Sequence, residues 1–260
     1  MANKPFKIAF CNSKGGTAKT SSTQNVAHAL ANKGRKVLLV DFDPQASLTY
    51  SFGIDPNDCE ASIADVLLED HDINDIIQKT TVEGVDLASG SLFLSSFDTA
   101  MSGDESRETK LKEALAKVKG YDFVLVDTPP TASLLMVNAL LSVDRFIVPV
   151  TPEYLAMQGL ATMMDVVDRV KGGYGKCASL LGILLTRTDY RNRATHELVS
   201  MIRKHYKAQV FKNEIKVNVR VSEAPSFGKT IFQHDWASSG AESYRLLTDE
   251  ILRKLKKEKK

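Results

Sequence analysis

The sequence predicts an α/β fold, a doubly wound and mostly parallel sheet with helices on both faces. Short apolar runs alternate along the chain with longer amphipathic stretches, which is the rhythm of βαβ units. The apolar runs are continuous, as expected of strands that are covered on both faces. Two of them end in an aspartate, Asp41 and Asp127. Polar residues therefore gather at the carboxyl ends of strands, where such sheets bind ligands.

The individual elements follow from these runs. Strands are expected at residues 6–10, 36–40, 121–126, 146–150 and 180–185. Helices are expected at 19–33, 107–119, 132–141, 155–170, 194–206 and 238–257. Segments 53–80 and 89–106 are less regular and are interpreted as insertions over the sheet edge or the site. Since no linker or repeat divides the chain, we expect one domain over residues 1–260, with a basic tail at about 253–260.

The composition is that of a soluble globular protein. The 260 residues include 34 Lys and Arg against 32 Asp and Glu, and 43% are hydrophobic, which excludes a wholly disordered chain. No apolar run approaches the ~18 residues that a membrane span requires. Cys11, Cys59 and Cys177 are far apart and form no CxxC pair, so neither a disulfide framework nor a zinc ribbon is indicated. A reducing, cytoplasmic setting is predicted.

The loop after the first strand has the composition of a phosphate-binding loop. Residues 11–21 read CNSKGGTAKTS and lead directly into a helix. Backbone N–H groups and the helix dipole at such a junction face an anion. Lys19 would place its positive charge against the terminal phosphates, and the Thr20 hydroxyl would ligate Mg²⁺. The standard pattern with two glycines is broken, because Ser13 and Ala18 occupy the glycine positions.

At this point the chain resembles a known family. Lys14-Gly15-Gly16-x-x-Lys19-Thr20 is similar to the deviant Walker A box, KGGxGK[ST], of the ParA/MinD group of P-loop ATPases. The resemblance implies that ATP is bound by residues 14–21, namely Lys14, Gly15, Gly16, Thr17, Ala18, Lys19, Thr20 and Ser21. It also implies that Lys14 and Lys19 are catalytic. Lys14 would reach across a nucleotide-sandwich homodimer to the partner's phosphates, as an arginine finger does.

Ala18 departs from the family, which has glycine there. If this position requires a positive φ, alanine is strained, and we expect the effect on hydrolysis rather than on nucleotide binding.

Two further motifs match the family in the right order. Asp41-Phe42-Asp43-Pro44-Gln45 resembles its D-x-D-P-Q segment. By this resemblance Asp43 is catalytic and positions the attacking water, while Asp41 supports the Mg²⁺ shell. Asp127-Thr128-Pro129-Pro130 resembles the D-x-P-P switch, in which the aspartate is a Walker B residue. The implied metal ligands are Thr20, Asp41 and Asp127.

The rest of the chain is similar to the Soj-type ParA branch in particular. Residues 182–186 and 218–229 carry this likeness. It implies that Asn218 belongs to the nucleotide site. It also implies that Arg191 and Arg220 lie on a DNA-binding face, although a single arginine taken alone is in most cases an ordinary solvated surface residue. Phosphate contacts of this kind provide affinity without sequence readout.

The family likeness implies a partition or positioning ATPase that uses ATP and Mg²⁺. It would dimerise on ATP, bind nucleoid DNA without sequence preference, and be released when a ParB-like or cargo adaptor protein stimulates its weak hydrolysis. The protein would then be cytoplasmic and nucleoid-associated.

Two alternatives stay open. A MinD-like membrane ATPase would use the basic C-terminal segment, whose apolar stripe is Ile251, Leu252 and Leu255, although membrane binding is not the favoured reading. An ATP-binding switch with little turnover would follow from Ala18.

Overall fold

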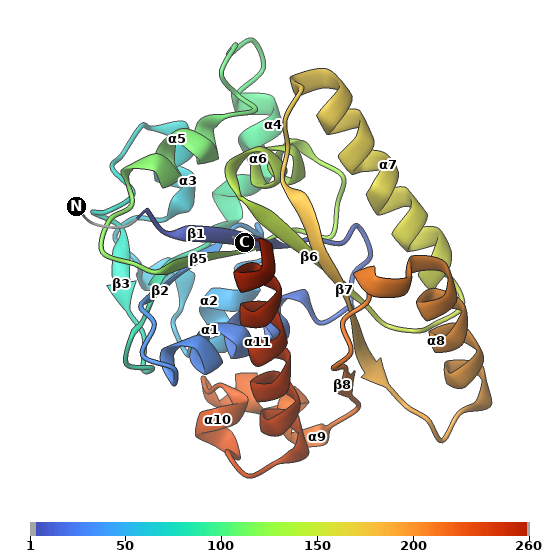
Figure 1. The fold of residues 1–260 in the computed structure, drawn as a ribbon. Helices are drawn as coiled ribbons and strands as arrows, with labels where there is room; N and C mark the ends of the chain where they lie inside the picture. Colours follow the sequence, from blue (N-terminus) through green and yellow to red (C-terminus); the bar gives the residue numbers. More distant parts are fainter. Residues whose placement is uncertain (1–3, 259–260) are drawn as a thin grey trace.

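The computed structural model describes residues 4–258, in which eight strands form one sheet in the order β3-β4-β2-β5-β1-β6-β7-β8 (Figure 1). All neighbouring strands are parallel except the edge pair β3 and β4. This confirms the expected mostly parallel sheet. The strands are β1 (Phe6–Phe10), β2 (Val37–Asp41), β3 (Ile77–Lys79), β4 (Val85–Ala88), β5 (Phe123–Asp127), β6 (Arg145–Val150), β7 (Ser179–Thr188) and β8 (Ile215–Lys216).

Helices cover both faces of the sheet, as a doubly wound fold requires (Figure 1). The helices are α1 (Lys19–Ala31), α2 (Ser47–Ser51), α3 (Ile63–Leu68), α4 (Phe97–Ala100), α5 (Lys110–Lys117), α6 (Leu134–Ser142), α7 (Ala156–Tyr174), α8 (Arg193–Tyr206), α9 (Val219–Glu223), α10 (Ile231–His234) and α11 (Ser239–Glu258). Short 3₁₀ turns occupy Pro56–Asp58, Leu92–Ser96, Lys207–Gln209 and Ala224–Phe227.

Two hydrophobic cores sandwich the sheet, because successive strand residues point to opposite faces. On one face Leu38 and Val40 of β2 join residues of α3 to α8. On the other face Val37 and Leu39 of the same strand join residues of α1, α2, α10 and α11. Burial on both sides explains why the strands read as continuous apolar runs.

The irregular segments contain structure that their sequence did not predict. The stretch interpreted as an insertion at 53–80 holds α3 and the edge strand β3. Ser62 and Asp65 form a capping box at the start of α3. Strands β4 and β8 were also missed, since four and two residues are too short to show a period. The long helices begin and end within a few residues of expectation, except that α5 begins at Lys110 and α7 runs on to Tyr174.

The C-terminal helix α11 packs along α1, and its apolar stripe faces the core (Figure 1). Ile251 is fully buried and Leu255 is 8% exposed. These two side chains therefore cannot face a lipid surface in this conformation. Among residues 4–258, none of the helices combines the length and the apolar character that crossing a membrane requires.

Candidate active site

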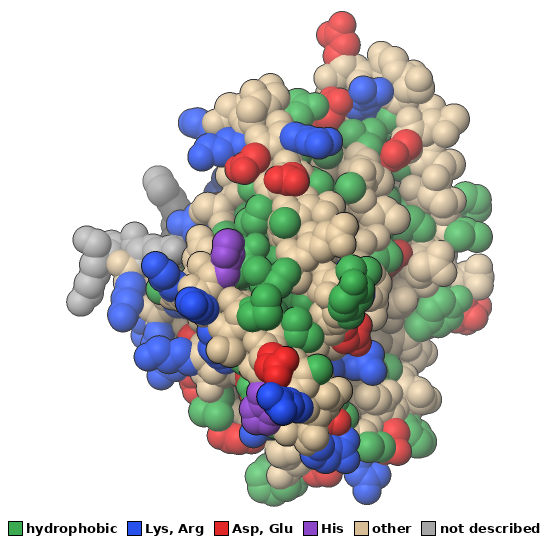
Figure 2. All heavy atoms as spheres, turned by 90° about the vertical axis from the view of Figure 1, so that its right-hand side faces the viewer, with side chains coloured by type: hydrophobic (Ala, Val, Ile, Leu, Met, Phe, Trp, Pro, Cys, Tyr) green, Lys and Arg blue, Asp and Glu red, His purple; other side chains and the backbone are tan. Residues whose placement is uncertain are grey.

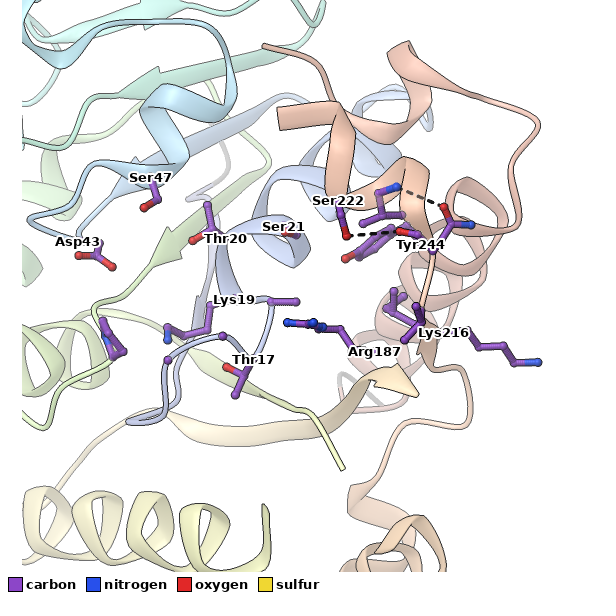
Figure 3. A pocket seen from close by; sticks show the side chains of 18 of the residues that line it. Thr17, Lys19, Thr20, Ser21, Asp43, Ser47, Arg187, Lys216, Ser222 and Tyr244 are labelled. Carbon is purple, nitrogen blue, oxygen red and sulfur yellow. Dashed lines mark hydrogen bonds between the residues drawn. The ribbon is translucent and has the colours of Figure 1, made fainter. Parts of the chain in front are cut away.

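A cavity of about 540 Å³ opens at the carboxyl end of the central strands (Figure 3). Its walls come from the loop between β1 and α1, the end of β2, the ends of β7 and β8, and helices α9 and α11. The lining residues are Gly15, Gly16, Thr17, Ala18, Lys19, Thr20, Ser21, Asp43, Gln45, Ser47, Pro130, Arg187, Ile215, Lys216, Val217, Asn218, Val221, Ser222 and Tyr244. The structure thus brings together in one cavity all the expected nucleotide-binding residues except Lys14.

The loop that lines the cavity has the backbone of an anion cradle. Gly16 has φ 72° and Ala18 has φ 60°, so two left-handed residues curl the chain before α1 begins. The Asn12 side chain braces the loop. Its Nδ2 donates to the Pro149 carbonyl at 2.7 Å, and its Oδ1 accepts from the Lys14 N–H at 2.9 Å. A curled loop that ends at a helix N-terminus presents N–H groups to a phosphate.

Ala18 occupies the left-handed region that glycine tolerates and other residues resist. Because Ala18 does have a positive φ, its backbone is strained, as expected for an alanine at a position where the resembling family has glycine.

Lys19 points into the cavity from the first residue of α1 (Figure 3). Its side chain is largely enclosed, and Nζ lies 3.3 Å from the Lys14 carbonyl. Burial lowers the pKa of Lys19, while Asp127 and Asp43 act in the opposite direction. A cation so poorly solvated gains strongly from a phosphate group.

Thr20 lines the cavity, and Asp127 lies buried directly behind it. The Thr20 hydroxyl donates to Asp127 Oδ2 at 2.6 Å, and the carboxyl is completely buried. Burial raises the pKa of Asp127 to about 8, and the negative charge of Asp41 adds to the rise. A buried carboxylate beside a hydroxyl suits a divalent cation, whose charge would offset the burial. Among the described residues, no three His, Cys, Asp or Glu side chains are placed so that together they could hold a metal ion. Mg²⁺ does not require three such ligands, because it keeps several waters and substrate oxygens.

Asp41 lies beside Asp127, because β2 and β5 pair in that register. It does not line the cavity. Its Oδ2 accepts from both the backbone N–H and the hydroxyl of Thr49, at 2.8 and 2.7 Å. A Cβ on Gly90 would lie 2.8 Å from the Asp41 carboxyl carbon, so this loop approaches as closely as glycine allows. Burial raises the pKa of Asp41 to about 6, against the Thr49 hydrogen bonds.

Asp43, two residues later, does reach the cavity (Figure 3). Its Oδ1 accepts from the Gln45 N–H at 2.9 Å, which directs the carboxylate at the strand end.

Lys14 lies at the rim of the loop and is turned away from the cavity lining. Its Nζ forms an ion pair of 2.8 Å with Glu153, on the connection between β6 and α7. The neighbouring Tyr154 is 91% exposed. The expected catalytic lysine thus stands at the molecular surface, paired with a carboxylate of its own chain.

The two expected DNA-binding arginines are both exposed and both paired. Arg191 forms a two-point pair with Asp189, at 2.8 and 2.7 Å. Arg220, in α9, pairs with Glu223 at 3.2 Å. On the face shown in Figure 2, a group of Lys and Arg side chains gathers at the left edge, whereas those near the top and bottom lie among Asp and Glu side chains. Asn218 lines the cavity and caps α9, accepting from the Val221 N–H at 3.2 Å.

Several lining residues were not predicted, above all Arg187 on β7 and the group Val221, Ser222 and Tyr244 on α9 and α11. These residues are far from the phosphate loop in sequence. Val221 and Ser222 lie within the Soj-like segment 218–229, but no role in the site was predicted for them. Packing of α11 along α1 brings Tyr244 to the cavity, whereas Arg187 reaches it from the end of β7.

Comparison with known proteins places these features in a family. A protein-family profile described as an AAA domain matches residues 6–177. The chain is 39% identical over 245 residues to the sporulation initiation inhibitor protein Soj of Bacillus subtilis, covering 94% of this chain and 97% of that protein. It is 35% identical over 248 residues to the chromosome partitioning protein ParA of Myxococcus xanthus, covering 95% and 88%. A Mycobacterium smegmatis structure described as cobyrinic acid a,c-diamide synthase with bound ADP and magnesium has a TM-score of 0.84 at 32% identity, covering 97% and 96%.

Proposed function

This chain belongs to the ParA/MinD family of deviant Walker A P-loop ATPases, close to the Soj-type ParA proteins, and from this we propose how it works. It is an ATPase that uses ATP and Mg²⁺ and belongs among chromosome and plasmid partition proteins. We propose that ATP drives a sandwich homodimer, that the dimer binds DNA without sequence preference, and that a ParB-like or cargo adaptor protein stimulates otherwise weak hydrolysis and releases it.

The observation that carries this proposal is that the loop, Lys19, Thr20 and Asp43 line one cavity, with Asp127 hydrogen-bonded to Thr20 from the buried side. The loop amides and Lys19 hold the phosphates and face the charge that develops on them. Thr20 and Asp127 hold Mg²⁺, which neutralises phosphate charge when bound. Asp43 accepts a hydrogen bond from the attacking water and orients it toward the terminal phosphate. Asp41 does not line the cavity; it holds α2 in place through Thr49 and packs closely against the loop at Gly90.

The position of Lys14 supports the dimer. A lysine that served its own nucleotide would be expected inside the cavity, whereas Lys14 pairs with Glu153 at the rim. In a dimer it would exchange this carboxylate for the partner's phosphates, so that dimerisation depends on ATP.

DNA binding is proposed for Arg191 and Arg220. Each would exchange an exposed carboxylate partner for a DNA phosphate. Exposed pairs contribute only about 0–1 kcal/mol, so this exchange is inexpensive. Binding would weaken steeply with salt, since it releases counterions. The protein would then be nucleoid-associated in the cytoplasm.

The two alternatives are affected differently by the structure. Burial of Ile251 and Leu255 removes most of the apolar stripe on which membrane docking would depend. The left-handed Ala18 favours slow turnover, and a nucleotide switch with little hydrolysis is therefore the second candidate.

The decisive experiment is DNA co-sedimentation with ATP·Mg²⁺, with ADP and without nucleotide, over a salt series. We expect DNA to be bound only with ATP, whatever its sequence, and more weakly as the salt concentration rises.

Three variants test the assigned residues. Lys19→Ala should lose nucleotide binding, and Lys14→Ala should keep nucleotide binding but lose the dimer. Arg220→Glu should lose DNA and keep the ATP dimer. Binding to anionic vesicles but not to DNA would refute the proposed function. If Lys14→Ala still forms a normal ATP dimer, the proposed role of Lys14 across the dimer is wrong.

A further inference from the structure

Arg187 occupies a bulge that directs its side chain into the nucleotide cavity. On β7, Thr186 pairs with Ile215 of β8 and Thr188 pairs with Lys216, so one extra residue of β7 stands between two consecutive residues of β8. That residue is Arg187, with φ 52°. A bulge interrupts the regular alternation of a strand and re-aims the side chain at that position.

The bulge is held from both sides. The hydroxyl of fully buried Thr186 donates to the Thr17 carbonyl in the phosphate loop at 3.0 Å. On the other side, the Thr188 carbonyl accepts from the Val217 N–H at 3.2 Å. An arginine is therefore kept in a backbone conformation that favours glycine. A strained backbone conformation of this kind persists only where surrounding contacts enforce it, and such residues are common at functional sites.

The guanidinium of Arg187 has no partner among residues 4–258, neither a hydrogen bond nor an ion pair. The next two arginines along the chain differ, because Arg191 pairs with Asp189 and Arg193 with Glu197. In Figure 3, Arg187 points from the end of β7 toward the loop of Thr17 and Lys19, whereas Lys216 on the adjacent strand points away. Arg187 is thus an unpaired cation aimed across the cavity.

Its place along the cavity indicates which part of a nucleotide it would meet. Lys19 and the loop serve the terminal phosphates at one end. The wall of Asn218, Val221 and Tyr244 closes the other end. In Figure 3, Arg187 lies between Lys19 and Tyr244, where the phosphate next to the ribose would pass in a nucleotide that spans the cavity. A guanidinium offers two N–H groups to one phosphate in a fork geometry.

We propose that Arg187 binds the α-phosphate of the nucleotide and thereby sets affinity for ATP and ADP alike. This inference rests on the proposed nucleotide site. Because the α-phosphate is common to both nucleotides and remote from the bond that breaks, Arg187 is a binding residue and not part of the hydrolytic machinery. Its loss would weaken both complexes equally, leaving the preference between them unchanged.

The test is calorimetric titration of the full-length protein with ATP·Mg²⁺, ADP·Mg²⁺ and inorganic tripolyphosphate. Arg187→Gln should raise the Kd for all three about tenfold, equal to about 1.4 kcal/mol. Arg193→Gln, an exposed arginine just beyond the same strand, is the matched control and should change none. Arg187→Gly removes the side chain and relieves the backbone, so it should weaken binding as Arg187→Gln does, and it keeps the test usable if the glutamine variant folds poorly.

Three results would overturn the assignment. One is unchanged affinity in both Arg187 variants. Another is a loss for ATP and ADP without a loss for tripolyphosphate, which would place the guanidinium on the base. The third is a loss for ATP but not for ADP. Failure of the proposed function itself would give a different result. Either the unaltered protein would bind no ATP, or Lys19→Ala would bind ATP as tightly as the unaltered protein.

Discussion

The ammonium group of Lys14 lies 2.8 Å from the Glu153 carboxylate, so the lysine expected to act on a partner molecule is held by its own chain. Both side chains are partly exposed, at 34% and 56%. The contact joins the rim of the phosphate loop to the segment that enters α7. A lysine engaged in this way must leave one negative partner before it can meet another.

Glu153→Gln is therefore expected to promote the ATP-dependent dimer. Each exposed pair is worth up to about 1 kcal/mol and the homodimer breaks two of them, so the gain in dimer affinity should be no more than about 30-fold. Sedimentation velocity over a range of protein concentrations with ATP·Mg²⁺ measures it. Asp249→Asn, which breaks the comparable surface pair with Lys33, is the control and should leave dimerisation unchanged. Weaker dimerisation of Glu153→Gln would mean that Glu153 itself contacts the partner.

Ala18→Gly should relieve strain and accelerate hydrolysis. A left-handed alanine costs about 1–2 kcal/mol, of which part is offset by the greater freedom of glycine in the unfolded chain. We expect the free energy of unfolding to rise by up to about 1 kcal/mol and the ATPase rate to increase several-fold. Ala46, with φ 50°, provides a matched control: Ala46→Gly should stabilise similarly without a faster rate. Equal rates in all three proteins would exclude Ala18 as the cause of slow turnover.

Asp127→Asn should stabilise the nucleotide-free protein while abolishing its response to Mg²⁺. Burial and the charge of Asp41 raise the pKa of this carboxyl to about 8, so the folded protein must either protonate it or keep a buried charge, and a neutral amide avoids both costs. An increase of about 2–4 °C in Tm corresponds to about 1 kcal/mol in a chain of this size. Differential scanning fluorimetry without ligand measures the change in stability, and the same measurement with ATP·Mg²⁺ measures the loss of the response to Mg²⁺. A variant that is less stable without ligand would show instead that the carboxylate is needed for its hydrogen bond with Thr20.

His28 should make the stability of the protein depend on pH. Its Nδ1 lies 2.6 Å from the Thr230 hydroxyl, its ring contacts Phe232, and burial lowers its pKa from 6.5 to about 4. Between pH 6.5 and 4, His28 is protonated in the unfolded chain but stays neutral in the folded protein. The free energy of unfolding should therefore fall as the pH falls from 6.5 toward 4, by at most about 1.4 kcal/mol per pH unit.

Urea denaturation at several pH values measures this slope. His28→Gln should reduce it between pH 6.5 and 4, while His205→Gln, at an exposed position of α8, should not. A slope that is the same in His28→Gln and in the unaltered protein would mean that other groups control the acid response.

Most of the phosphate site was determined by the sequence on its own. The loop of residues 14–21, the strands that end in Asp41 and Asp127, and the helix that begins at Lys19 are local features. They are set by hydrophobic runs, turn residues and a helix start within a few positions of each other. Parallel pairing of β2 with β5 then places the two aspartates side by side, as a doubly wound sheet requires.

The tertiary structure alone decided what each of these residues touches. Asp41 is bound by Thr49, Lys14 by Glu153, and Arg187 is turned into the cavity by a bulge opposite β8. These contacts join segments that are remote in sequence or depend on strand register, and no local period encodes them. The apolar stripe of α11 is a similar case, because a basic amphipathic helix suits a membrane or a core equally well until packing against α1 buries it.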